Sequence, residues 1–188
     1  MIALNIAIYF SNNVNEQLKN LQNNISNNLI NFNKERVPHI TLIQFFCDNT
    51  NIEKINTYVQ NINLNGFCKN ICYTQKKIVD NYIVYQMIPD EDNFLIEIRC
   101  KILNDIESSI EYPKKENMEF VENIQYNGLH ELVLNNSKST YLPHITLGLS
   151  KENNPVNIMN DNFYINSKDM KIKLFQVGDF GTTCSIVV

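Results

Sequence analysis

Residues 37–42 read Val37-Pro38-His39-Ile40-Thr41-Leu42, and nearly the same hexapeptide recurs at residues 142–147 as Leu142-Pro143-His144-Ile145-Thr146-Leu147. Only the first position differs, where one branched aliphatic residue replaces another. The chain has 3 histidines, and two of them occupy the same position of this repeat. A lone copy would be interpreted as a structural histidine, but the duplication favours two copies of one functional element.

Each copy is predicted to form a β-strand with one polar and one apolar face. The motif is rich in β-branched residues, and its proline stands at the start of the strand, where a missing N–H is tolerated. Alternate side chains of a strand share a face. His39 and Thr41 therefore point one way and the aliphatic residues beside them point the other, and the same holds for His144 and Thr146.

Two such strands beside one cleft would supply two imidazoles and two hydroxyls to a small volume. The pKa of an unperturbed imidazole is about 6.5, so near neutral pH one histidine can accept a proton while the other donates one. Hydrolysis of a phosphodiester needs both acts, and threonine hydroxyls can donate hydrogen bonds to the phosphate oxygens. We therefore predict His39 and His144 as catalytic residues and Thr41 and Thr146 as phosphate-binding residues. This scheme requires no metal or other cofactor, and it leaves open which histidine is the acid.

The paired motif resembles that of the two-histidine (2H) phosphoesterases, which carry one H-x-[ST] sequence in each half of a pseudo-symmetric fold. Both His39-Ile40-Thr41-Leu42 and His144-Ile145-Thr146-Leu147 match this pattern, and their wide separation suits one motif per lobe. The resemblance implies a bilobal α+β fold and a metal-independent phosphodiesterase. The family includes RNA 2′,3′-cyclic phosphodiesterases, also called 2′-5′ RNA ligases, and enzymes that cleave 2′-5′ oligoadenylates, so the substrate stays open.

Length and charge restrict the class of protein. A chain of 188 residues with 44% hydrophobic residues can bury the core of one domain, which we take to span residues 1–188. A net charge of −4 argues against a protein that coats long nucleic acid, but it allows a short oligonucleotide in a locally positive cleft. Lys76-Lys77 and the pair Lys171 and Lys173 are interpreted as solvated strand surface.

The cysteines and the N-terminus indicate the compartment. The 5 cysteines are scattered and odd in number, which favours free buried thiols in a reducing compartment over disulfides or a zinc site. The first residues alternate like a strand and lack the basic start of a signal peptide. No stretch approaches the apolar length of a membrane span. We therefore expect a cytoplasmic protein that does not associate with a membrane, and we expect it to be a monomer.

Apolar periodicity predicts an alternation of strands and helices. We expect strands at 2–10, 38–46, 71–79, 82–88, 142–149, 170–177 and 183–188, and helices at 14–30, after Asp48-Asn49-Thr50 and after 89–92. Residues 110–140, with His130, are interpreted as a loop insertion and 151–168 as loop or short helix. This order suits an α+β, bilobal and pseudo-symmetric fold of two mostly antiparallel β-sheets, with helices on their outer faces and the motif strands along a central cleft.

Three aromatic residues are candidates for stacking on a nucleobase: Tyr9, Phe45 and Tyr141. Phe45 should share the face of His39 by strict alternation, and Tyr9 lies on an otherwise small and polar strand face. We predict a phosphodiesterase that hydrolyses a 2′,3′-cyclic phosphate or a 2′-5′ bond in an RNA end, a cyclic nucleotide or a short, signalling oligonucleotide. The alternative is a non-catalytic RNA- or nucleotide-binding module with the same cleft. A purely structural duplication would leave the polar strand faces unexplained.

Overall fold

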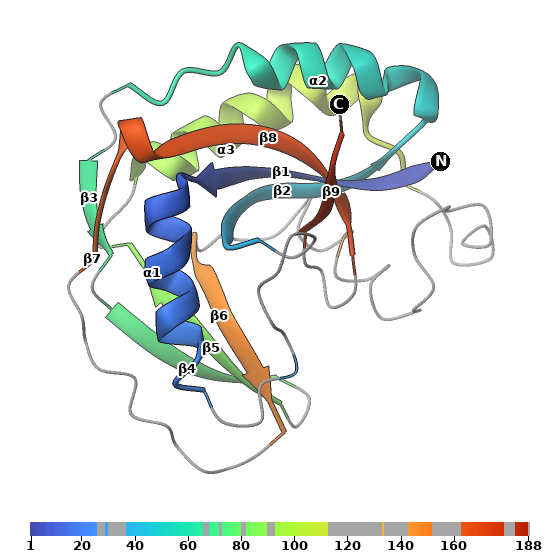
Figure 1. Cartoon of the computed structure of the whole chain (residues 1–188). Coiled ribbons are helices and arrows are strands. Elements are labelled where there is room, and N and C mark those ends of the chain that lie inside the picture. The colour runs from blue at the N-terminus through green and yellow to red at the C-terminus, as the bar shows by residue number, and fades with distance from the viewer. Residues whose placement is uncertain are drawn as a thin grey trace.

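A computed structural model describes residues 1–25, 29, 37–65, 68–71, 73–79, 82–89, 93–112, 133, 143–151, 163–178 and 183–187. The fold is α+β, as predicted, and the strands are paired antiparallel (Figure 1). The strands are β1 (Ile2–Phe10), β2 (His39–Cys47), β3 (Cys68–Ile71), β4 (Tyr73–Val79), β5 (Tyr82–Ile88), β6 (Ile145–Ser150), β7 (Phe163–Asn166), β8 (Met170–Val177) and β9 (Thr183–Ile186). The helices are α1 (Asn12–Gln22), α2 (Ile52–Gln60) and α3 (Asn93–Ile106), and short 3₁₀ turns lie at Asn49–Asn51, Glu107–Ser109 and Ser167–Asp169.

The two motif strands are neighbours in one sheet. Seven strands follow the order β4-β5-β6-β2-β1-β8-β9, and β3 pairs with β7 in a separate small sheet. The junction between β6 and β2 consists of a single residue pair, Ile40 with Ile145. Sequence periodicity predicted two sheets facing each other across a cleft, whereas the hydrogen bonding joins the strands of both motifs edge to edge at this one point.

Strand β1 lies between β2 and β8, and its side chains form one apolar face and one small, polar face. Its apolar residues form the core face, and all of them are buried: Ile2, Leu4, Ile6, Ile8 and Phe10. The other face carries the small and polar residues, as the alternation predicted: Ala3, Asn5, Ala7 and Tyr9. Burial of the aliphatic side chains contributes roughly 1.5–3 kcal/mol each, so this strand is a main source of stability.

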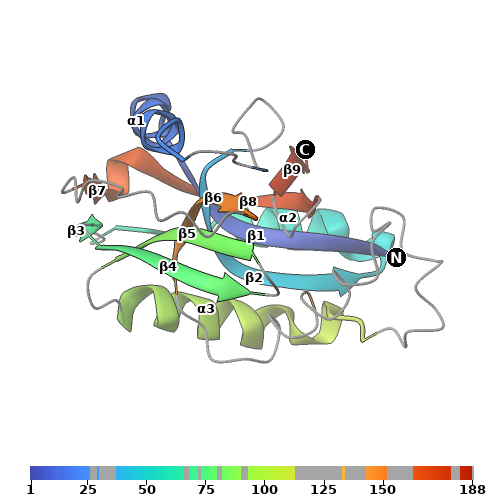
Figure 2. The same ribbon diagram turned by 90° about the horizontal axis from the view of Figure 1, so that it is seen from below.

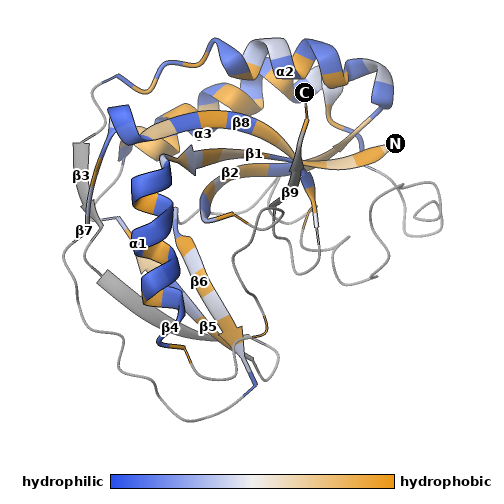
Figure 3. Ribbon diagram, viewed as in Figure 1, coloured by the Kyte–Doolittle hydropathy of each residue, from blue (hydrophilic) through white to orange (hydrophobic). Residues whose placement is uncertain are grey.

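The three helices pack against the strands of the large sheet. Helix α2 contacts β8, and α3 contacts β2. Figure 2 shows α3 along one side of the strands and α1 on the opposite side. Hydrophobic residues follow the strands of the sheet in Figure 3, while the visible side of α1 is largely hydrophilic. The buried residues of the three helices join one hydrophobic cluster: Val14, Leu18, Leu21, Ile55, Val59, Leu95, Ile102 and Ile106.

Helix α1 is shorter than its periodicity predicted. The expected helix over 14–30 ends at Gln22, and Ile25 is buried outside the helix. Two asparagines, Asn23 and Asn24, follow the last helical residue, and asparagine favours caps and turns over helix interiors. Beyond the helix, the backbone N–H of Leu29 donates a 2.7 Å hydrogen bond to the carbonyl oxygen of Leu149 in β6, so Leu29 lies beside the second motif strand.

The other predicted elements agree with the structure, where it describes them, except in two places, and most of the loop insertion expected over 110–140 lies outside the described residues. The strand expected at 71–79 is β4 from Tyr73, and the preceding β3 is a separate strand that pairs with β7. The segment 151–168 was expected to be loop or short helix, but it contains β7. Asp48 caps the turn before α2, because its carboxylate accepts a hydrogen bond from Thr50 N. His130 and Tyr141 lie outside the described residues.

Candidate active site

The two motif strands pair at the isoleucine that follows the histidine in each copy of the repeat. Ile40 and Ile145 are fully buried, which places their side chains in the core. The polar residues on either side of each isoleucine are only partly buried: His39, Thr41, His144 and Thr146. Because side chains alternate along a strand, all four polar residues project from the opposite face of the sheet, as the sequence predicted.

The antiparallel register determines how these four side chains are arranged. With Ile40 opposite Ile145, the adjacent position His39 lies opposite Thr146, and Thr41 lies opposite His144. Each histidine therefore lies beside the threonine of the other motif. The two histidines are diagonal neighbours, which in an ideal antiparallel pair are roughly 7–8 Å apart. Burial is the main reason why the pKa of His39 is low, and repulsion from His144 lowers it further.

The backbone carbonyl of Val37, just before β2, holds His39 in one tautomer. Its Nδ1 lies 2.9 Å from the carbonyl oxygen of Val37, and since a carbonyl can only accept, Nδ1 carries the proton. The neutral ring therefore has its lone pair on Nε2. Burial of the ring lowers the pKa of His39 from 6.5 to about 4; the Val37 carbonyl opposes this effect and the charge of His144 adds to it. At neutral pH the ring of His39 is uncharged.

Thr41 is oriented by a buried amide. Asn5 of β1 is fully buried, and its Nδ2 donates a 3.3 Å hydrogen bond to Thr41 Oγ1. Because the threonine oxygen is the acceptor here, its hydroxyl proton is directed to another partner. The Oδ1 of Asn5 has no hydrogen-bond partner among the described residues.

The second motif is held by α1. The side chain of Gln22, the last residue of the helix, is buried and donates a 2.7 Å hydrogen bond from Nε2 to the Leu147 carbonyl oxygen. On the other side, Thr146 pairs in register with Gln86 of β5, whose side chain is also buried. Figure 1 shows α1 beside β6. The helix and β5 thus support the motif strand from both sides.

Both motif strands contain a β-bulge at the same position. The pairing of β1 with β2 moves from Ala7–Thr41 to Ile6–Ile43, so Leu42 is the extra residue. The pairing of β5 with β6 moves from Gln86–Thr146 to Tyr85–Gly148, so the extra residue is Leu147 (the same position of the repeat). A bulge shifts the alternation of every side chain that follows it.

This bulge makes the prediction for Phe45 wrong. Phe45 pairs with Leu4 on the core face and is 1% exposed, so its ring cannot stack on a nucleobase at the site. Gln44 and Phe46 take the face of His39 instead, and Phe46 is buried against Ala3 in a separate small cluster. Strict alternation from His39 to Phe45 fails because Leu42 adds one residue to the strand.

Tyr9 is on the site face, directly opposite His39 in the register of β1 and β2. Its partly buried ring lies 6.4 Å from the ring of Phe175, and the ammonium of Lys173 lies 5.1 Å from the Tyr9 ring centroid. The position of Tyr9 is compatible with the predicted stacking role, which stays a prediction. Lys171 is exposed, as a solvated strand residue would be, whereas Lys173 is partly buried over the aromatic ring.

Sequence reasoning did not select Asn5, Gln22 or Lys173 as residues of the site. A buried polar residue in an apolar strand was the available signal for Asn5, since such a residue needs a hydrogen-bond partner. Nothing in the sequence indicates that Gln22 reaches the carbonyl of Leu147, because that contact spans more than half of the chain.

The described residues contain no group of three His, Cys, Asp or Glu side chains that could hold a metal ion. Cys47 and Cys100 are free thiols; Cys47 is buried, which raises its pKa to about 12, but Cys100 is exposed, contrary to the expectation that the thiols are buried. None of the described helices is long and apolar enough to cross a membrane. The cytoplasmic location and the monomeric state stay predictions.

Comparison with known proteins gives no relative from which a function could be transferred. The chain matches no model of a known protein family, and it has no significant match among curated proteins.

Proposed function

We propose that this protein is a metal-independent phosphodiesterase of the two-histidine type, which hydrolyses a 2′,3′-cyclic phosphate or a 2′-5′ phosphodiester bond. Its substrate would be an RNA end, a cyclic nucleotide or a short oligonucleotide. The observation that carries the proposal is the antiparallel pair Ile40–Ile145, because this pair gathers both H-x-T motifs on one face of the sheet. The motif pair and its register are the basis of the proposal.

The proposed reaction uses the two histidines in opposite roles. Nε2 of neutral His39 takes a proton from water, and the water oxygen forms a bond to phosphorus. The phosphorus–oxygen bond to the ribose breaks, and His144 in its protonated form donates a proton to that leaving oxygen. The low pKa of His39 favours it as the base, and the negative charge of the substrate favours the protonated form of His144.

Hydroxyl and ammonium groups would hold the phosphate. Thr41 would donate its hydroxyl proton to a non-bridging oxygen, while its oxygen accepts the hydrogen bond from Asn5 Nδ2. Thr146 occupies the same position in the second motif. Lys173 of β8 pairs in register with Ala7 of β1, and Ala7 pairs with Thr41 on its other side. The ammonium of Lys173 would attract the anionic substrate. Stabilising charge on the phosphate oxygens is often the largest single contribution to such a rate enhancement.

We further propose that the sheet consists of two lobes related by an approximate two-fold axis between Ile40 and Ile145, with the catalytic cleft at their junction. Three observations support this. Each half has the order strand, helix, motif strand, namely β1-α1-β2 and β5-α3-β6. Each motif strand has its bulge at the same leucine. Each helix contacts the motif strand of the other half, α1 on β6 and α3 on β2.

The test uses the purified chain with EDTA and a panel of 2′,3′-cyclic nucleotides and of 2′-5′ and 3′-5′ oligoadenylates. We expect turnover of at least one substrate. We expect His39→Ala and His144→Ala each to lower kcat by about 10²- to 10⁴-fold. His130→Ala is the matched control, since it removes the one histidine outside the motifs. Equal turnover by the His39→Ala/His144→Ala double variant would refute the proposal.

The competing function is a binding module that keeps the same cleft. It predicts saturable binding of oligonucleotides without turnover at any pH. The restrained tautomer and low pKa of His39 favour catalysis over binding, because a binding site needs donors but no titrating base. Binding measured alongside turnover on the same substrate panel separates the two functions.

A further inference from the structure

Lys173 of β8 lies on the same face of the sheet as the polar residues of the first motif. It pairs in register with Ala7 of β1, and Ala7 pairs with Thr41 of β2. Residues directly opposite each other on antiparallel strands share a face, so Lys173 and Thr41 project from the same side. These residues form one row across the sheet, and the neighbouring row on this face contains Tyr9 and His39.

The side chain of Lys173 leans along its strand toward the row that contains His39. Its ammonium nitrogen lies 5.1 Å from the centroid of the Tyr9 ring. A lysine ammonium within about 6 Å of an aromatic centroid is attracted by the electrons of the ring face. The Tyr9 ring lies in turn 6.4 Å from the ring of Phe175. Tyr9, with Phe175 beside it, therefore holds the charge of Lys173 next to the row of His39.

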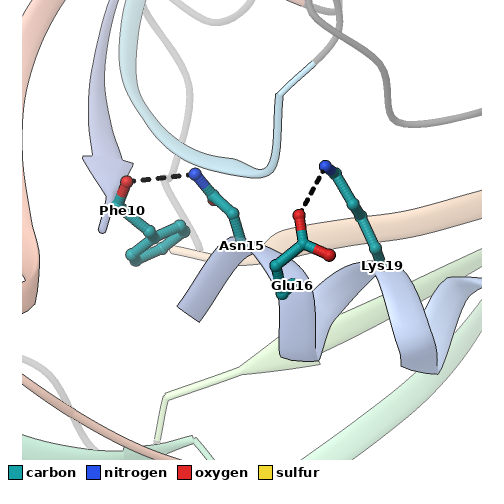
Figure 4. A network of polar contacts seen from close by, with 4 residues as sticks. All are labelled: Phe10, Asn15, Glu16 and Lys19. Atoms are coloured by element: carbon teal, nitrogen blue, oxygen red, sulfur yellow. Dashed lines mark hydrogen bonds and ion pairs between the residues drawn. The ribbon is translucent and has the colours of Figure 1, made fainter. Parts of the chain in front are cut away.

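The ammonium of Lys173 is available to an anionic ligand. Lys173 is partly buried and forms no ion pair among the described residues. Lys19 of α1 differs, because its Nζ lies 2.9 Å from Oε1 of Glu16, as Figure 4 shows. Lys171 is exposed, so water screens its charge. Of these three lysines, Lys173 should therefore interact most strongly with a phosphate.

The position of Lys173 suits a phosphate next to the one that reacts. Strand β1 separates β8 from β2, and neighbouring strands lie about 4.8 Å apart, so the backbones of Lys173 and Thr41 are about 10 Å apart. The reacting phosphate would lie at the junction of β2 and β6, whereas the ammonium is held over the Tyr9 ring of β1. At least one strand spacing thus separates the two. One ribose bridges a gap of this order between successive phosphates of a nucleotide.

We propose that Lys173, held by Tyr9, binds a second phosphate of the substrate, which one ribose separates from the reacting phosphate. The inference rests on the proposed phosphodiesterase function and narrows its substrate. An oligonucleotide, or a 2′,3′-cyclic nucleotide with a 5′-phosphate, is preferred over a nucleotide that carries the cyclic phosphate alone. Lys173 is the specificity-determining residue, and Tyr9 is a positioning residue that acts through it.

The experiment compares adenosine 2′,3′-cyclic phosphate with its 5′-phosphorylated form, which differs only in the second phosphate. We expect kcat/KM to be about 5- to 20-fold higher for the 5′-phosphorylated substrate, a range between an exposed ion pair and a buried charge-assisted hydrogen bond. Lys173→Met keeps an apolar side chain over Tyr9 and should bring this ratio to about one. Lys171→Met, on the same face of β8, should keep the wild-type ratio. Equal kcat/KM for both substrates in the wild type, or equal losses in the two lysine variants, would overturn the subsite but leave the phosphodiesterase standing.

Variants of Tyr9 separate positioning of Lys173 from stacking on a base. Tyr9→Phe keeps the ring face and should keep the ratio, whereas Tyr9→Leu should lower the ratio toward one. A ring that only stacked on the base would affect both substrates alike, so an unchanged ratio in Tyr9→Leu would overturn the positioning role.

Binding tests the subsite independently of catalysis. If neither substrate is turned over, the phosphodiesterase fails, and calorimetric titration with adenosine 3′,5′-bisphosphate and adenosine 3′-phosphate tests the subsite alone. Tighter binding of the bisphosphate that is lost in Lys173→Met and kept in Lys171→Met supports the subsite. Equal affinity for the two ligands, or no binding of either, overturns it.

Discussion

The pKa of His39 makes the stability of the protein depend on pH in a defined direction. The folded protein resists protonation of this ring until about pH 4, whereas the unfolded chain takes up the proton near pH 6.5. Between these values the unfolded state binds more protons, so stability is complete above about pH 6.5 and falls as the pH is lowered. The pKa difference corresponds to about 3 kcal/mol, and about 2 kcal/mol of it is lost by pH 5.

His39→Gln removes this contribution but keeps an amide that can donate toward the Val37 carbonyl. The free energy of unfolding is measured for both proteins by urea titration, monitored by circular dichroism, from pH 7.5 to pH 5. Other titrating groups largely cancel in the difference between the two proteins. We expect that difference to change by about 2 kcal/mol, with wild type losing more stability. His130→Gln should show no such change, and a difference for His39→Gln that stays constant with pH would refute the burial and repulsion inferred for His39.

Three further predictions concern the residues around the motif. We expect Thr41→Val to lower kcat by about 10²-fold and Thr41→Ser to retain most activity, as steady-state kinetics would show; equal losses would mean that the hydroxyl is not the donor. Asn5→Leu should lower kcat by about tenfold in the wild type and have no further effect in a Thr41→Val background; additive losses would separate Asn5 from Thr41. Phe45→Ala should cost about 3–5 kcal/mol of stability in urea titration and leave KM unchanged, whereas a raised KM with full stability would return its ring to the substrate side.

Local periodicity was sufficient to predict the elements that position the site. Alternation in the first motif correctly placed His39 and Thr41 on the face opposite the buried Ile40, because the strand is regular up to the threonine. It failed one residue later. Leu42 is a bulge residue with no glycine or other local signal, since the bulge results from pairing with β1 and not from the side chain itself.

Contacts between distant parts of the chain were beyond sequence reasoning. The edge-to-edge pairing of β2 with β6 rests on one residue pair, and no periodicity distinguishes it from two strands that face each other across a cleft. The ring of His39 has a low pKa because other elements bury it, so the sequence left the acid and the base unassigned. Burial of the His39 ring by distant elements cannot be seen in two motifs of the same sequence.

The register at Ile40–Ile145 also makes the proposed site indivisible. Each histidine lies opposite the threonine of the other motif, so a phosphate bound by His39 is within reach of Thr146 as well as Thr41. One motif alone would bring a base without an acid and would lack the strand that places the second hydroxyl. Neither copy of the repeat would therefore form an active site by itself. In the proposed reaction, duplication would supply both the base and the acid, and the burial that lowers the pKa of His39 favours this copy as the base.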